Sequence, residues 1–243
     1  MMIRFWGGRR KVAPRRIASC VTRAGALAAL ALSVPAPVTV HAADTAGEAP
    51  RSEAAARVAD WIAASGDNGS LPYIIIDKNG ANLFLFDADG EAAGEAPVLI
   101  GIAPGDDATP GVGSKELSKI GPAEKTTPAG RFLAKFGRAA GNEQVLWVDY
   151  HTSVALHPVV TGNKKERRRE RLLSETAEDN RITFGCINVP PSFYTRSITP
   201  LFKKSGGIVY ILPDTKDLED VFPLLRVQPF LDRGILTPAK IEK

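Results

Sequence analysis

A cysteine thiol and two histidine rings are the side chains of this chain best suited to nucleophilic catalysis. Cys186 directly follows Gly185, and His157 ends the apolar stretch of residues 154–156. A free thiol is mostly protonated at neutral pH, so it needs a neighbouring base to become a nucleophile. We therefore take Cys186 as the candidate nucleophile and His157 as its candidate base. Both also have ordinary interpretations, an inert buried thiol and a hydrogen-bonded imidazole, while His151 has the setting of a turn residue.

The glycine before the cysteine adds a second element of such a site. Gly185 would let a substrate approach the backbone closely and would leave backbone N–H groups free to bind an oxyanion. The chain has no HExxH sequence and no Cys and His residues clustered at metal-ligand spacing. We therefore expect thiol chemistry without a metal ion or any other cofactor.

The first 43 residues have the composition of a secretory signal peptide. Residues 1–23 hold seven of the 31 Lys and Arg residues and no acidic residue, an apolar run follows at 26–34, and small residues precede a cleavage point near Ala43. The apolar run is too short to span a bilayer comfortably. We expect export to the periplasm with no stable membrane span after cleavage, and the alternative is an uncleaved N-terminal anchor.

Removal of this segment changes both the net charge and the cysteine count. The formal net charge of +4 becomes negative, because the seven basic residues leave while all 27 acidic residues stay. A basic surface for nucleic acid is therefore not expected. Cys20 leaves as well, so Cys186 has no partner for a disulfide within the mature chain. We expect a monomer.

The hydrophobic periodicity predicts a mainly β chain with a few peripheral helices. Ser52 as N-cap and Gly66 as a stop predict a short helix over residues 52–64, within an N-terminal extension of residues 44–71. Apolar stretches separated by turn signals predict strands at residues 73–76, 82–86, 97–102, 130–136, 144–150, 153–157 and 207–212. They predict a sheet-based core over residues 72–213, followed by a polar C-terminal tail over residues 214–243.

Two connections between these strands are long. Residues 103–127 are rich in Gly, Pro, Asp and Lys, and their Gly-rich stretch at 111–115 has neither phosphate-loop nor dinucleotide spacing, which indicates a surface loop. Residues 164–171 carry six basic and two acidic side chains. Two interpretations of this segment stay open. It is either a solvated helix with local charge compensation, or a lid beside the active site whose arginines bind carboxylates of an anionic polymer.

Four segments resemble the YkuD-type L,D-transpeptidase family, in the family's order along the chain. The sequence Thr183-Phe-Gly-Cys-Ile-Asn188 resembles the [Ser/Thr]-His-Gly-Cys-x-[Arg/Asn] signature, and Leu156-His157 resembles the segment of the catalytic histidine. Thr127-Pro-Ala-Gly-Arg-Phe132 resembles the Thr-Pro-x-Gly-x-Phe element, and residues 202–211 resemble the closing Gly-x-x-Val-x-Ile strand. The resemblance covers residues 72–213 and implies a β-sandwich or barrel-like L,D-transpeptidase fold.

The resemblance also implies an activity and a set of site residues. It implies a periplasmic acyltransferase that acts on peptidoglycan stem peptides, through a thioester on Cys186 that the amine of a second stem resolves into a cross-link. His157 would take the thiol proton, and no cofactor is needed. The residues expected to shape the site or hold the oxyanion are Thr183, Phe184, Gly185 and Asn188, and those expected to bind substrate are Tyr150 and Arg181.

The sequence departs from the family pattern in two places. Phe184 stands where the family has a histidine before Gly-Cys, and the interval between His157 and Thr183 is longer, because residues 164–171 are inserted there. We expect Phe184 to alter substrate positioning or specificity without removing the base. If a backbone carbonyl orients the imidazole, Pro158 still supplies one. Two alternatives stay open: an L,D-carboxypeptidase or other hydrolase that resolves the same acyl-enzyme with water, and a non-catalytic wall-binding protein of the same fold.

Overall fold

The computed structural model describes residues 51–233, and the expected signal peptide at residues 1–43 lies outside this range. The strands of the described part are β1 (Tyr73–Asp77), β2 (Asn82–Phe86), β3 (Ala92–Pro97), β4 (Ile100–Gly101), β5 (Gly130–Arg138), β6 (Gln144–Asp149), β7 (Val154–Pro158), β8 (Arg181–Thr183), β9 (Ile187–Val189) and β10 (Gly207–Ile211). Its α-helices are α1 (Glu53–Ser65), α2 (Arg168–Leu172), α3 (Pro191–Phe193), α4 (Thr199–Phe202), α5 (Leu218–Val221) and α6 (Gln228–Asp232). The prediction of a mainly β fold with a few helices is confirmed. No helix among residues 51–233 is both long enough and apolar enough to cross a membrane.

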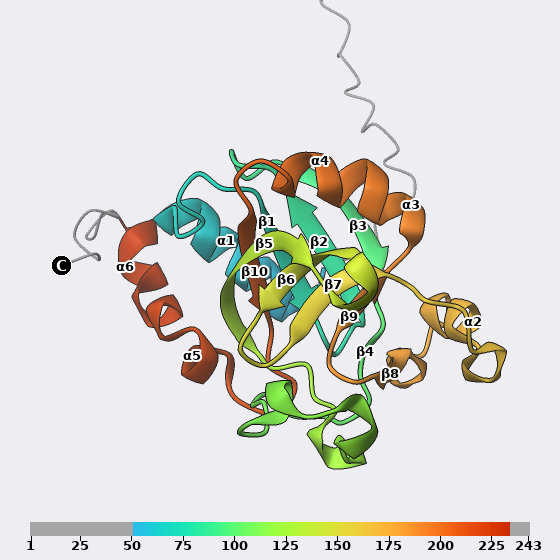
Figure 1. Ribbon diagram of the computed structural model, residues 1–243. Coiled ribbons are helices and arrows are strands. Elements are labelled where there is room, and N and C mark those ends of the chain that lie inside the picture. The colour runs from blue at the N-terminus through green and yellow to red at the C-terminus, as the bar shows by residue number, and fades with distance from the viewer. Residues whose placement is uncertain (1–50, 234–243) are drawn as a thin grey trace, which may run out of the picture. The chain divides into compact units, whose positions relative to one another are not determined.

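Eight of the strands form one curved sheet in the order β3-β2-β1-β10-β5-β6-β7-β9 (Figure 1). Neighbouring strands are antiparallel except for the pairs β1–β10 and β7–β9, which are parallel. The two edges of the sheet meet where Leu99, just after β3, exchanges backbone hydrogen bonds of 2.9 Å with Asn188 of β9. The sheet is thus nearly closed and barrel-like, and β4 and β8 form a second, two-stranded sheet next to this junction.

Apolar side chains fill the inside of the curved sheet. β1 is buried on both faces, as its uninterrupted apolar run predicts. Ile74 and Ile76 point into an inner cluster that also contains Leu156 of β7 and Ile187 of β9, and all four are fully buried. Moving either of the last two strands by one residue would expose this apolar face to water. The core therefore fixes the register of β7, which carries His157, and of β9, which directly follows Cys186.

The predicted N-terminal helix is α1, and it packs on the outer face of the sheet. The Ser52 hydroxyl accepts from the Ala55 N–H at 3.1 Å, and Gly66 ends the helix with a φ of 69°. The buried face of α1 includes Val58 and Ile62, which lie in one apolar cluster with residues of β1, β2 and β10. Over residues 53–65 the N-terminal extension is therefore part of the domain.

One predicted strand lies in a different place. The sequence favours a strand over residues 97–102, whereas β3 ends at Pro97 and only Ile100–Gly101 resume pairing, as β4. Between them Val98 is fully buried in the inner cluster. The apolar run predicted a continuous strand, but these residues instead turn from the main sheet into the barrel junction.

The C-terminal segment is more than a polar tail. Residues 218–232 form α5, a 3-10 turn over Pro223–Val227 and α6, and Figure 1 shows α6 next to α1. Phe222 and Leu225 are buried in the same apolar cluster as α1. The many charged neighbours of these two residues concealed their burial in the sequence. Residues 234–243 of the predicted tail lie outside the described part of the chain.

The long loop of residues 103–127 is anchored by a buried lysine. It contains 3-10 turns over Val112–Ser114, Leu117–Lys119 and Pro122–Glu124. Lys78, directly after β1, is completely buried and pairs with Asp106 at 2.7 Å and with Asp214 at 3.3 Å. Burial works to raise the pKa of Asp106, but hydrogen bonds from Lys78, from Thr215 and from backbone N–H groups hold this pKa well below its ordinary range. This network ties the loop to the ends of β1 and β10.

Candidate active site

β7 and β9 bring the candidate nucleophile and base onto one face of the sheet. In this parallel pair Leu156 is opposite Ile187, and His157 is opposite Asn188. Leu156 and Ile187 point into the inner cluster, so His157 and Asn188 point outward. Cys186 directly precedes β9, two residues before Asn188, and the alternation of the strand extended by one residue directs it to the same outer face. The spacing and rise of β-strands put the Cα atoms of Cys186 and His157 roughly 8 Å apart, diagonally across the pair.

Both ring nitrogens of His157 have defined partners. Nδ1 lies 2.9 Å from the carbonyl oxygen of Pro158, which can only accept, so Nδ1 carries the proton. Nε2 is then the basic nitrogen, and the side-chain Nδ2–H of Asn188 donates to it at 3.1 Å. The proline after the histidine thus supplies the carbonyl that selects the tautomer.

Arg168 of α2 sets the direction of the Asn188 amide. Its Nη1 donates to Asn188 Oδ1 at 2.9 Å, and its Nε pairs with Glu166 at 2.5 Å. Because Oδ1 accepts from Arg168, Nδ2 is the end of the amide that faces His157. The sequence did not single out Arg168. Only the position of residues 164–171 between the histidine and the cysteine could have indicated that an arginine reaches the site.

The Cys186 thiol is half-buried and faces the backbone of the β6–β7 turn. Sγ donates to the Ser153 carbonyl oxygen over a distance of 3.7 Å. Ser153 has a φ of 60°, a conformation uncommon for a residue other than glycine. The thiol of Cys186 and the Nε2 lone pair of His157 therefore lie on one face of the sheet, each bonded to a different neighbour.

Burial makes the neutral forms of both groups the stable ones. It raises the pKa of the Cys186 thiol, an effect that the Ala155 backbone and the Arg168 charge only partly offset. Burial also lowers the pKa of His157, against the effect of the Pro158 carbonyl and with a further lowering by Arg168. Both directions favour a neutral thiol beside a neutral imidazole in the resting site, rather than an ion pair.

The Thr183 hydroxyl fixes the turn that leads to Cys186. It donates to the Cys186 carbonyl at 2.6 Å and accepts from the Gly185 N–H at 3.1 Å. Gly185 has a φ of 124°, and a Cβ at this position would lie 2.7 Å from the carbonyl oxygen of Thr126, so the turn requires glycine. The expectation that the Gly185 N–H is free for an oxyanion is wrong, because Thr183 occupies it. The Cys186 N–H is the other backbone donor next to the sulfur.

Thr127 supports the same turn from a neighbouring segment. Its hydroxyl donates to the Gly185 carbonyl at 2.8 Å and accepts from the Gly101 N–H at 2.8 Å, and the side chain is almost fully buried. Thr127, the first residue of the Thr-Pro-Ala-Gly segment, therefore joins the Gly185 turn to Gly101. Thr127 was absent from the predicted site residues, although that segment is one of the four that carry the family resemblance.

Phe184 lies at the surface next to the nucleophile turn. It is 39% exposed, and the Lys125 ammonium stands 3.8 Å from the centre of its ring. A cation at this distance over an aromatic face is attracted to it. The family that the motifs resemble has a titratable histidine ring at this position. This chain instead has an apolar ring with the positive charge of Lys125 over its face.

The two predicted substrate-binding residues have different surroundings. The Arg181 guanidinium pairs with Asp214 at 2.6 Å, and Asp214 also contacts Lys78, so the charge of Arg181 is used within the fold rather than for a substrate. Tyr150 is 76% exposed in the β6–β7 turn, with its ring edge-on to Trp147 at 5.0 Å between centroids. This turn also carries the carbonyl that faces Cys186, so Tyr150 is available at the rim of the site.

A groove of about 380 Å³ runs beside His157. Its walls include Val145, Val159 and Tyr194, with the carboxylate of Glu143 at one side. Apolar walls with one charged group are typical of peptide and small-molecule sites. The imidazole is therefore accessible to a ligand from this groove.

No model of a known protein family matches this chain, and no curated protein matches it either. Among residues 51–233 there is no group of three or more His, Cys, Asp and Glu side chains that could hold a metal ion. Function must therefore be inferred from the chemistry of the site and from the motif resemblance.

Proposed function

We propose that this protein is a cysteine L,D-transpeptidase that acts on peptidoglycan stem peptides. The observation that carries the proposal is the shared outer face of β7 and β9, where the Cys186 thiol lies diagonally from an imidazole whose tautomer is set by the Pro158 carbonyl. The four motif segments support the same reaction. The basic leader predicted at residues 1–43 would bring the chain to the periplasm, where this substrate lies.

The first half of the reaction forms a thioester. His157 Nε2 takes the proton from Cys186 Sγ, and the thiolate attacks the carbonyl that precedes the terminal D-Ala of a tetrapeptide stem. A C–S bond forms, the peptide C–N bond breaks, and D-Ala leaves with the proton that His157 held. The Nε2 lone pair is bonded to the Asn188 amide at rest, so this amide must give way before the thiol can use it.

Stabilisation of the tetrahedral oxyanion falls to the Cys186 N–H. The Gly185 N–H is occupied by Thr183 at 3.1 Å, whereas the rigid turn holds the next N–H beside the sulfur. A backbone donor fixed in advance costs no reorganisation when charge develops on the oxygen. The turn built by Thr127 and Thr183 thus supplies the second catalytic element.

The second half of the reaction transfers the acyl group. An acceptor amine that enters the groove beside His157 loses its proton to Nε2 and attacks the thioester carbonyl, which releases the thiol and forms a new amide. If water reaches the carbonyl first, the same acyl-enzyme gives a tripeptide, and the protein is an L,D-carboxypeptidase. The two outcomes differ only in which nucleophile occupies the groove.

A carbapenem tests the nucleophile, because the family resemblance implies that such a compound acylates the thiol. Intact-mass measurement should show one adduct on the wild type, none on Cys186→Ser and very slow formation on His157→Gln. His151→Gln is the matched control, since His151 is exposed in the β6–β7 turn. An unmodified wild-type protein whose thiol also fails to react with small alkylating agents would refute the enzyme and favour a wall-binding protein.

Purified muropeptides then test the reaction type. Incubation of the protein with tetrapeptide monomers should yield a cross-linked dimer and free D-Ala, as separated by chromatography and identified by mass. Tripeptide without dimer would instead identify the hydrolase. Phe184→His should leave the dimer as the product, because the proposal gives that position a role in substrate placement and none in proton transfer.

A further inference from the structure

The insertion between β7 and β8 forms a second groove, separate from the one beside His157. This groove has a volume of about 330 Å³ and is lined mainly by the chain from Thr161 to Glu170. The segment consists of a 3-10 turn over Lys164–Glu166 and the short helix α2, joined at Arg167, which has a φ of 50°. The insertion is therefore folded, with a defined concave face.

Positive charge dominates this concave face. Lys164, Arg167 and Arg169 line the groove and are exposed to solvent. None of the three forms an ion pair with a carboxylate of residues 51–233. Clustered basic side chains in a concavity raise the local concentration of anions. Glu166 is already paired with Arg168, and Glu170, the one other acidic side chain of the groove lining, offsets only one of the three positive charges.

Arg168 connects this groove to the candidate active site. It lines the groove, its side chain is only 14% exposed, and its Nη1 holds the Asn188 amide at 2.9 Å. Its Nε is used by Glu166, while its Nη2 has no acceptor among residues 51–233. A guanidinium with donors to spare can take one more carboxylate oxygen. An anion in the groove would thus lie one side chain away from Asn188, the neighbour of both Cys186 and His157.

We infer that the groove formed by Thr161, Asn163, Lys164, Arg167, Arg168 and Arg169 binds a carboxylate of the donor stem peptide. The inference rests on the proposed function for the identity of the ligand, and on the groove alone for its anionic chemistry. A tetrapeptide stem is rich in carboxylates, and one of them lies on the D-Ala that the thiolate releases. Binding a carboxylate through Arg168 would place the adjoining peptide next to the nucleophile. This basic groove is thus a subsite for the donor stem and lies next to α2. The groove beside His157, by contrast, has the acidic side chain of Glu143 in its wall.

A pair of alkylating agents tests the charge of the groove without any need for catalysis. Iodoacetate and iodoacetamide both form a C–S bond with Cys186 and release iodide, but only iodoacetate carries a carboxylate. Arg167→Gln/Arg169→Gln should slow iodoacetate by about five- to tenfold and leave the iodoacetamide rate unchanged. The preference of the wild type for iodoacetate should also fall as salt is added.

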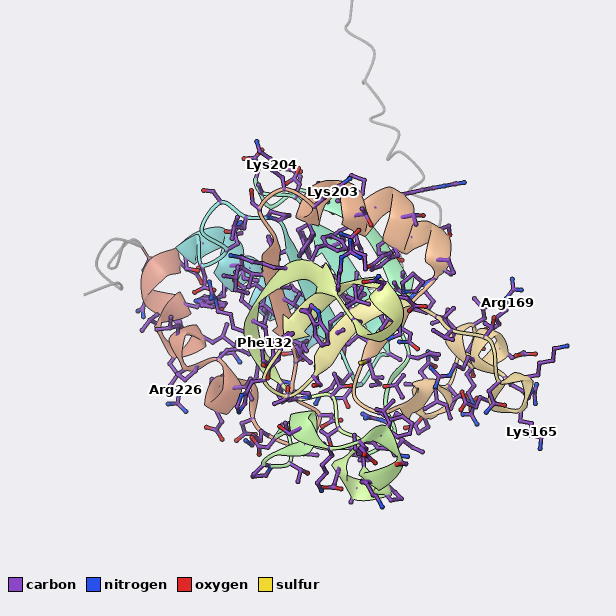
Figure 2. All side chains as sticks on the ribbon, viewed as in Figure 1. Phe132, Lys165, Arg169, Lys203, Lys204 and Arg226 are labelled. Carbon is purple, nitrogen blue, oxygen red and sulfur yellow. The ribbon has the colours of Figure 1, made fainter. Side chains whose placement is uncertain are left out.

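A matched variant separates local charge from net charge. Lys203→Gln/Lys204→Gln removes the same two charges from exposed positions after α4, which Figure 2 shows well away from Arg169. This variant should keep the wild-type ratio of the two rates. An equal loss in both variants, or an unchanged ratio in Arg167→Gln/Arg169→Gln, would overturn the subsite.

Donor peptides test the identity of the ligand. With tetrapeptide stems whose carboxylates are free, the wild type should have a kcat/KM about tenfold higher than with stems whose carboxylates are amidated, and Arg167→Gln/Arg169→Gln should lose this preference. If amidation has no effect while the iodoacetate preference holds, the groove binds another anion, such as the phosphate of a wall polymer, and the inference fails. Failure of the proposed function is a separate result, because it would abolish both the carbapenem adduct and the alkylation of Cys186 in the wild type, whereas failure of the subsite would leave both intact.

Discussion

Replacement of Thr127 by valine isolates the contribution of one hydroxyl to the nucleophile turn. Valine keeps the shape of the side chain but removes the acceptor of the Gly101 N–H and the donor to the Gly185 carbonyl, each 2.8 Å from the hydroxyl oxygen. Both glycines and Thr127 are buried, so water cannot replace these bonds. Each buried polar group left without a partner costs about 1–3 kcal/mol. With two such groups, Thr127→Val should therefore lower the free energy of unfolding by about 2–6 kcal/mol.

The neighbouring threonine provides the control. Thr126 is also buried, at 7% exposure, and its hydroxyl makes no side-chain hydrogen bond with residues 51–233. Urea unfolding should show a change of less than about 0.5 kcal/mol for Thr126→Val. Alkylation of Cys186 should slow only in Thr127→Val, because the turn that aims the thiol loses its support. Equal stability of the two variants would refute the role assigned to the Thr127 hydroxyl.

Three further substitutions test the anchor, the turn and the base. Lys78→Met should lower the free energy of unfolding by about 3–5 kcal/mol in urea denaturation, because it leaves the buried carboxylate of Asp106 without its cation. Gly185→Ala should cost about 1–3 kcal/mol and slow thiol alkylation, since its φ of 124° suits glycine, whereas Gly162→Ala, with open space around its Cβ, should have no effect. Asn188→Asp should raise the pKa of His157 by about 1–2 pH units, because a carboxylate next to Nε2 stabilises the imidazolium. An NMR titration measures this pKa, and an unchanged value would contradict the contact of 3.1 Å.

Of the two strands next to the site, β7 was predicted from its apolar run, whereas the three-residue β9 was not, although both have a local signal. The stretches around Leu156 and Ile187 are apolar at alternate positions, and the hydrophobic effect places those positions inside. Once the inner residues are assigned, the outward direction of His157 and Asn188 follows from the period of the strand. The order of the motifs along the chain was therefore sufficient to predict that Cys186 and His157 act together. The register between β7 and β9 came only from the structure.

The supporting contacts could not be predicted, because they join segments far apart in the sequence. Lys78 is followed by an Asn-Gly turn, and nothing near it indicates that it meets Asp106 and Asp214 inside the fold. A lysine is almost always exposed, so the local sequence favours the wrong environment. Arg168 is one of several similar residues in a charged run, and only the path of the backbone after Arg167 decides which guanidinium reaches Asn188.

The geometry of the resting site connects the departure from the family pattern with the control of reactivity. His157 Nε2 has one lone pair, which cannot accept from the Asn188 amide and from the Cys186 thiol at once. Arg168 holds the amide in the competing position, and Arg168 itself belongs to the long segment between β7 and β8. A ligand carboxylate that draws the guanidinium away would release the amide and free the lone pair for the thiol. The segment would then keep the thiol protonated until a donor is bound. If the chain is exported as proposed, this would protect Cys186 from oxidation, because the thiolate rather than the thiol is the reactive form.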